Sequence, residues 1–142
     1  MEVEAEEVYL GGIAHADFIV MGFPGNGIHV TNRRLILVRS SFGFGFGLLG
    51  SVTSLGAERT GRLSGKAGRS RIRQLEKKMY FDAYKRDLAC LEMKVPDRTG
   101  LSRLRIIPKS GEPMEVSLNS VRDYEVVKTL MNLFYSEIVR II

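Results

Sequence analysis

Apolar residues recur along this chain in two rhythms, and each rhythm predicts a different kind of element. Short apolar runs bounded by glycine, proline or polar clusters are typical of β-strands. Near the C-terminus, apolar residues instead return every three or four positions, which predicts an amphipathic helix. The runs expected to form strands are 18–21, 28–30, 35–38, 80–85, 89–95, 104–107 and 114–118, with 8–10 as a less distinct addition.

The clearest strand pair lies between Gly27 and Arg39. Residues 28–30 form a short β-prone run, residues 35–38 form a second one, and the polar segment Thr-Asn-Arg-Arg separates them. Asn32 tolerates a positive φ and can hydrogen-bond its own turn, so it suits a reversal of the chain. This segment therefore predicts a β-hairpin with a polar, doubly basic turn.

The helical rhythm extends from residue 121 to about residue 140, a length of roughly 30 Å at 1.5 Å per residue. Ser120, followed three residues later by Asp123, resembles a capping box with Asp in the place of the usual Glu or Gln. We expect this helix to lie across a small sheet or to close its open end. Its apolar positions have a 3–4–3–4–3 spacing, widened by Leu130 and Leu133: Tyr124, Val127, Met131, Phe134, Ile138 and Ile141.

The middle of the chain changes character twice. Residues 40–57 carry no charge and are rich in Phe and Gly, whereas residues 59–78 carry eight Lys or Arg and a single acid, Glu76. The uncharged run contains five Gly and five Ser or Thr, so it falls short of the about 20 mostly apolar residues of a membrane span. Glycines at 61, 65 and 68 also disfavour a helix, at roughly 1 kcal/mol each relative to alanine. We therefore expect a helix only from Ser70 to Met79, with Ile72, Leu75 and Met79 forming an apolar stripe.

Composition and charge predict a cellular compartment and the kind of partner that the chain binds. The chain has 142 residues, 44 % apolar and 26 % charged, which suits one domain with a real core. Its net charge of +5 is unevenly spread: residues 1–7 hold four Glu and no base, so the basic stretch 59–78 stands out and indicates an anionic partner. A single cysteine, Cys90, excludes an intrachain disulfide, and the N-terminus lacks a signal-peptide pattern. We expect a cytoplasmic protein that can attach peripherally to a membrane.

Residues 27–38 carry a resemblance to a known family. GRAM-type and bacterial members of the pleckstrin-homology-like (PH-like) family commonly show a Gly, an apolar triplet, Thr-Asn, a basic pair and an apolar run, and Gly-Ile-His-Val-Thr-Asn-Arg-Arg-Leu-Ile-Leu-Val resembles that pattern closely. Residues 6–8, 12–15 and 81–88 are similar to the flanking regions of such sequences. The resemblance implies an α+β, mainly β fold: a single domain, 1–142, with a bent antiparallel sheet or barrel of about seven strands capped by the C-terminal helix. Residues 41–79 would be an insertion between strands. The family implies a fold more than a function, and no phosphoinositide-clamp motif is recognisable.

Motifs for catalysis or cofactor binding are weak. Residues 45–50 match G-x-G-x-x-G, but a dinucleotide site also needs a βαβ unit and an acid about 20 residues further on. The two histidines, His15 and His29, have no Cys or acid cluster beside them and are interpreted as structural. Cys90 is interpreted as a small buried apolar residue. We therefore expect no enzyme activity, no cofactor and no metal, and no small-molecule substrate is evident.

The insertion is the candidate contact surface. Its apolar members, which we expect to enter a membrane interface or contact a partner, are Phe42, Phe44, Phe46, Leu48 and Leu49. Its bases, which we expect to bind anionic headgroups, are Arg59, Arg62, Lys66, Arg69, Arg71 and Arg73. These residues favour a non-catalytic binding or scaffold domain at an anionic phospholipid surface.

Two alternatives remain open. In the first, the chain is a protein-interaction or self-assembly module, a homo-oligomer formed through the glycine-rich segment or through the Ile72, Leu75 and Met79 stripe, with no lipid binding. In the second, the basic stretch 59–78 binds nucleic acid. The aromatic residues are not interleaved with these basic residues, as stacking on nucleobases requires, so nucleic acid is a less favoured partner than lipid or protein.

Overall fold

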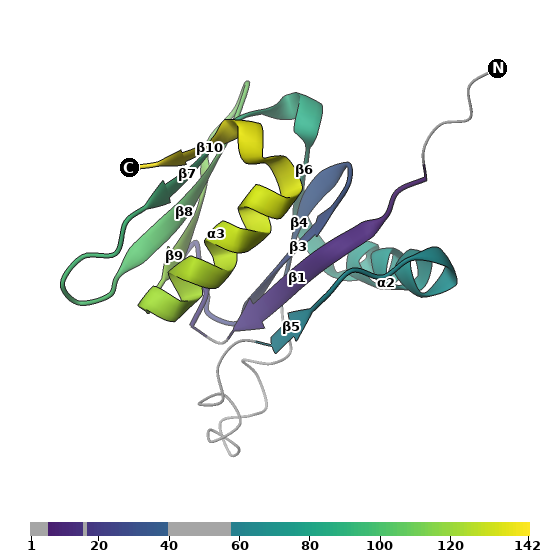
Figure 1. The fold of residues 1–142 in the computed structure, drawn as a ribbon, viewed down its shortest axis with the longest axis horizontal. Helices are drawn as coiled ribbons and strands as arrows, with labels where there is room; N and C mark the ends of the chain where they lie inside the picture. The colour runs from purple at the N-terminus through teal and green to yellow at the C-terminus, as the bar shows by residue number, and fades with distance from the viewer. Residues whose placement is uncertain (1–5, 16, 40–57) are drawn as a thin grey trace, which may run out of the picture.

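Two sheets with a helix between them form the framework of the chain, and a second helix lies on the outside of one sheet (Figure 1). A computed structural model describes residues 6–15, 17–39 and 58–142. The first sheet has the order β5-β1-β3-β4-β6, with all neighbours antiparallel. Its strands are β1 (Tyr9–His15), β3 (Asn26–Thr31), β4 (Arg34–Arg39), β5 (Glu58–Thr60) and β6 (Met79–Tyr84).

The second sheet has the order β10-β7-β8-β9-β2 and is antiparallel except for the parallel pair of β10 and β7. Its strands are β2 (Ile19–Val20), β7 (Leu88–Lys94), β8 (Ser102–Pro108), β9 (Met114–Leu118) and β10 (Val139–Ile141). The described residues thus form ten strands in two sheets, one with a parallel pair, where one bent antiparallel sheet or barrel of about seven strands was expected. Seven of the ten have five residues or more, and the three short ones extend the sheets. The mainly β, α+β class is confirmed.

The predicted hairpin is confirmed, and the structure gives its register. β3 and β4 pair from Asn26↔Arg39 to Val30↔Leu35, with the Thr-Asn-Arg-Arg segment at the reversal. Inward-facing side chains of this hairpin, such as Ile28 and Leu35, are fully buried. Because side chains alternate across a strand, His29 and Ile36 point to the opposite face, and both faces of the hairpin are therefore covered.

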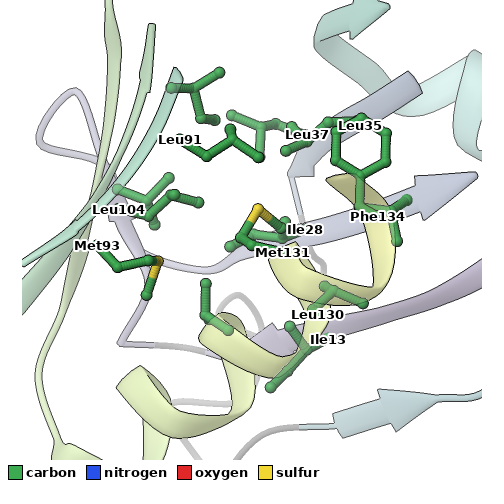
Figure 2. Close-up of a cluster of buried hydrophobic side chains, with 14 of the residues drawn as sticks. Ile13, Ile28, Leu35, Leu37, Leu91, Met93, Leu104, Leu130, Met131 and Phe134 are labelled. Atoms are coloured by element: carbon green, nitrogen blue, oxygen red, sulfur yellow. The ribbon is translucent and has the colours of Figure 1, made fainter. Parts of the chain in front are cut away.

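The main core lies between the two sheets and around α3 (Val121–Tyr135), as Figure 2 shows. The predicted cap is present, since the Asp123 N–H donates to Ser120 Oγ at 3.0 Å. The helix buries four residues of the predicted face together with Leu130: Tyr124, Val127, Met131 and Phe134. Leu133, which was expected to widen this face, is instead 55 % exposed.

The C-terminal helix is shorter than predicted. It ends at Tyr135, and a 3₁₀ turn (Ser136–Ile138) leads into β10, which pairs with β7. The main-chain N–H of Ile142 donates to Met93 O at 3.0 Å, and Val95 N–H donates to Ile142 O at 3.0 Å. The prediction of a helix to residue 140 was wrong because the last residues are mostly β-branched, and they find an open strand edge that satisfies their backbone.

The described end of the middle segment is integrated into the fold rather than looped out. β5 pairs with β1, and α2 (Gly65–Lys78) packs on the first sheet. The helix begins five residues earlier than Ser70, despite its glycines. A Cβ at Gly68 would collide with Leu63 O, so glycine permits the close approach of the incoming chain to the helix. Met79, expected in the helix, is the first residue of β6.

Candidate anion-binding surface

A second, smaller apolar cluster holds α2 against the outer face of the first sheet, on the side opposite α3 (Figure 1). Ile72 and Leu75 of the helix are buried there against Tyr9, Ile36 and Val38. The apolar stripe of α2 is thus packed against the same chain. This corrects the alternative in which Ile72, Leu75 and Met79 form a dimer interface, because two of these side chains are buried and Met79 packs against the same cluster.

Four bases line the opposite, exposed face of α2 at a 3–4–4 spacing. These are Lys66, Arg69, Arg73 and Lys77, here named the basic ridge, and all four are exposed. Residues three and four apart are neighbours on a helix surface, so the ridge is a continuous row of positive charge. It spans roughly 16 Å at 1.5 Å per residue.

The one acid of α2, Glu76, is bound by Arg34 of β4. Glu76 Oε2 accepts a hydrogen bond from Arg34 Nη2 at 2.7 Å, and Arg34 also binds Glu7 (2.9 Å) and Asp82 (3.1 Å). The Arg34 side chain is only 5 % exposed. Burial alone would lower the pKa of Arg34, but its hydrogen bonds to Glu76, Glu7 and Asp82 raise it above the ordinary value, so its charge is permanent.

The hairpin reversal holds the N-terminal segment beside α2. The Asn32 Oδ1 accepts from Val8 N–H at 2.7 Å, and Thr31 Oγ1 donates to Glu7 Oε2 at 2.7 Å. Arg34 completes the contact through the same Glu7 carboxylate. Thr31, Asn32 and Arg34 therefore serve the fold, and the motif that carries the family resemblance is a structural clamp in this chain.

Arg71 is not part of the basic ridge, because its side chain extends towards the sheet. Its guanidinium carbon lies 5.9 Å from the centre of the Tyr9 ring, and Tyr9 Oη is 2.8 Å from His29 Nδ1. Burial lowers the pKa of His29 to about 4, helped by the charges of Arg71 and Lys78. Burial raises the pKa of Tyr9 to about 12. Both side chains are neutral at pH 7, which fits the structural interpretation of His29. Gly12 makes room for them, since a Cβ there would collide with His29 Nδ1 and Tyr9 Oη.

Arg59 lies on the other side of the sheet. It pairs with Ile13 and lines a groove of about 390 Å³ between β1, β5 and α3, where Glu125 lies on the helix side. The structure thus brings together three of the six predicted bases, Lys66, Arg69 and Arg73, and separates Arg59 and Arg71 from them. Arg62 is exposed in the segment before α2. Lys77, which sequence reasoning left out, belongs to the ridge. The predicted contact residues Phe42, Phe44, Phe46, Leu48 and Leu49 lie outside the described residues.

Sequence reasoning also missed an exposed apolar tip. Met21 is 66 % exposed and Phe23 55 % exposed, in the turn between β2 and β3. Phe23 and Tyr80 flank the Arg39 guanidinium, at 4.5 and 5.0 Å from their ring centres. Asn26, fully buried, donates to Phe23 O at 2.7 Å. The only advance signal was the Met-Gly-Phe-Pro-Gly composition, which marks a turn without showing what it exposes.

The described residues hold no group of three or more His, Cys, Asp or Glu that could bind a metal ion. Cys90 is half-buried rather than buried, and burial raises the pKa of its thiol, which disfavours a reactive thiolate. Within the same part of the chain, no helix is long and apolar enough to cross a membrane. The chain matches no protein-family model, no curated protein and no solved structure.

Proposed function

We propose that this chain is a non-catalytic binding domain of PH-like architecture that attaches peripherally to anionic phospholipid surfaces through the basic ridge of α2. The observation that carries this proposal is the sorting of charge on α2. Its one acid is engaged by the nearly buried Arg34, and its apolar residues are buried in the second cluster. Four bases are left facing outward in a row.

The order of elements supports the PH-like part of the proposal. The longer strands come first in two antiparallel groups, and a single amphipathic helix then packs between the sheets (Figure 1). α2 lies outside this framework on an exposed face. A helix placed there can contact a flat surface without disturbing the core.

The composition of α2 favours lipid over nucleic acid. The helix has no aromatic residue between its bases, whereas proteins that bind single strands stack bases on aromatic rings. Headgroup binding needs only charge, at roughly 1 kcal/mol for each base near an anionic surface. Four bases then contribute about 4 kcal/mol, a weak attachment that apolar insertion must reinforce. Phe42, Phe44 and Phe46 remain the predicted source of that insertion.

The test is co-sedimentation with vesicles of phosphatidylserine and phosphatidylcholine, compared with phosphatidylcholine alone, at low and high salt. We expect binding that requires phosphatidylserine and falls as salt rises. The triple change Lys66→Gln, Arg73→Gln and Lys77→Gln should weaken binding roughly 100-fold, since three bases are removed at about 1 kcal/mol each.

The matched control is Lys94→Gln, Arg98→Gln and Lys109→Gln. These bases are also exposed and lie at or next to strands of the second sheet, so the net charge falls equally. If both triple variants lose the same affinity, the ridge is not the contact surface. If the unmodified chain ignores phosphatidylserine at low salt, the membrane proposal is wrong and a protein-interaction module becomes the better interpretation.

A further inference from the structure

One of the four ridge bases is already bound to an acid from the N-terminal segment. Glu6 Oε1 lies 2.8 Å from Arg69 Nη1. Asn32 holds this segment in place, because its Nδ2 donates to Glu6 O at 3.1 Å and its N–H donates to Val8 O at 3.0 Å. Figure 1 shows the purple segment that leads into β1 on the side of the molecule where α2 lies. The contact is therefore built by the hairpin clamp and joins residues 63 positions apart.

We propose that Glu6 is a tethered competitor for the anion site: it occupies Arg69 until a densely charged surface displaces it. This inference rests on the proposed function of the ridge and adds a determinant of its specificity. The other three ridge bases, Lys66, Arg73 and Lys77, form no ion pair with the described residues. Among the described residues, Arg69, between Lys66 and Arg73 in the row, is the one ridge position paired with an acid of the same chain.

The Glu6–Arg69 ion pair is strong enough to affect anion binding and weak enough to break. The Arg69 side chain is 47 % exposed and that of Glu6 57 % exposed, so water screens the pair and either side chain can swing away. A fixed tether keeps the Glu6 carboxylate at a high local concentration. A single dissolved anion must compete with that carboxylate for one base, whereas a phospholipid surface gains contacts with four bases at once. Glu6 should therefore raise the density of negative charge that binding requires.

The experiment compares Glu6→Gln with Glu115→Gln on phosphatidylserine-containing vesicles. Glu115 is exposed and lies 3.8 Å from Arg103 in the second sheet, so both variants gain one unit of net charge and lose one surface ion pair. We expect Glu6→Gln to bind about 1.5- to 5-fold more tightly than Glu115→Gln at low salt, the range that corresponds to an exposed ion pair. It should also begin to bind at a lower phosphatidylserine fraction.

Adding Arg69→Gln separates competition from a general charge effect. In the unmodified chain Arg69→Gln should cost less affinity than Arg73→Gln, because Arg69 must first leave Glu6. In the Glu6→Gln background the two losses should become equal. Circular dichroism of each variant checks that α2 remains folded.

The outcomes separate this inference from the function on which it rests. If the unmodified chain binds and Glu6→Gln equals Glu115→Gln, the competitor role is refuted while the membrane proposal stands. If Glu6→Gln begins to bind at a lower phosphatidylserine fraction than the unmodified chain and Glu115→Gln, both are supported. If neither the unmodified chain nor any variant binds at any phosphatidylserine fraction, both the competitor role and the membrane proposal fail.

Discussion

Replacing Arg34 with methionine tests how the charges around α2 are divided between fold and function. Arg34 makes four hydrogen bonds of 2.7–3.3 Å to the carboxylates of Glu7, Glu76 and Asp82. Methionine keeps much of the side-chain volume and removes every donor. The three carboxylates then face one another without a counter-charge, in a site where Glu7 is only 17 % exposed.

The size of the effect follows from burial. Removing one partner of a buried ion pair typically costs 3–5 kcal/mol, because the remaining charge stays desolvated. Glu76 and Asp82 are 44 % and 31 % exposed, and water screens them, which argues for the lower end. We therefore expect Arg34→Met to lower the free energy of unfolding by about 3 kcal/mol, measured by urea denaturation with the slope unchanged.

A second variant tests the reason for the loss. Neutralising the carboxylates as well, with Glu7→Gln, Glu76→Gln and Asp82→Asn, should restore most of the stability, since replacing a whole buried ionic group by neutral residues is often nearly neutral. If Arg34→Met alone is within about 0.5 kcal/mol of the unmodified chain, Arg34 does not hold α2 and the N-terminal segment in place. In that case Arg34 does not hold Glu76, and the argument that the acid of α2 is engaged away from the basic ridge fails.

Two further predictions concern neighbouring features. His29 has a folded pKa of about 4 against an ordinary 6.5, so between these values the unfolded chain binds more protons. Stability should fall by about 3 kcal/mol as the pH drops from 6.5 to 4 and then level off; denaturation across this range should show that slope, and His29→Gln should lack it. Met21 and Gly22 both have positive φ, at 51° and 82°, in a turn closed by two hydrogen bonds between Val20 and Phe23. Because a residue such as Asn tolerates that conformation better, Met21→Asn should raise the free energy of unfolding by about 0.5 kcal/mol, and a lower melting temperature would contradict this strain.

The local elements of the fold could be predicted, because their causes are local. The hairpin between β3 and β4 follows from two apolar runs and a turn residue, Asn32. The start of α3 follows from the Ser120 cap, and its buried face follows from the spacing of residues such as Val127 and Met131. In each case the residues that decide the structure are close in sequence.

The element ends depended on partners distant in sequence and could not be predicted. The spacing that marks α3 continues to Ile141, but the chain leaves the helix because β7 offers an edge. Helix propensity alone places the start of α2 after its glycines. The actual start, at Gly65, depends on the contact of Gly68 with Leu63 and on the apolar cluster under Ile72.

The same limit applies more strongly to charge. Composition showed that residues 59–78 are basic, but a base becomes available to a partner only when the fold has not used it. The Arg71 guanidinium lies over the Tyr9 ring, and Arg59 lies on the other side of the sheet. Arg69 is hydrogen-bonded to Glu6, 63 residues away in sequence. None of these assignments can be read from spacing along the chain.

The position of the hairpin turn links the two charged segments of this chain. Through Thr31, Asn32 and Arg34 it fixes the acidic N-terminal segment, and through Arg34 it fixes Glu76 of the basic helix. One turn thus determines which acids neutralise which bases; among the described residues, three ridge bases have no ion pair and Arg69 is paired with Glu6. Under the proposed function, the family-like motif affects binding without touching a ligand, because its side chains determine how much positive charge α2 presents. A change at Asn32 should accordingly alter anion binding through Glu6, at a residue that makes no contact with the ridge itself.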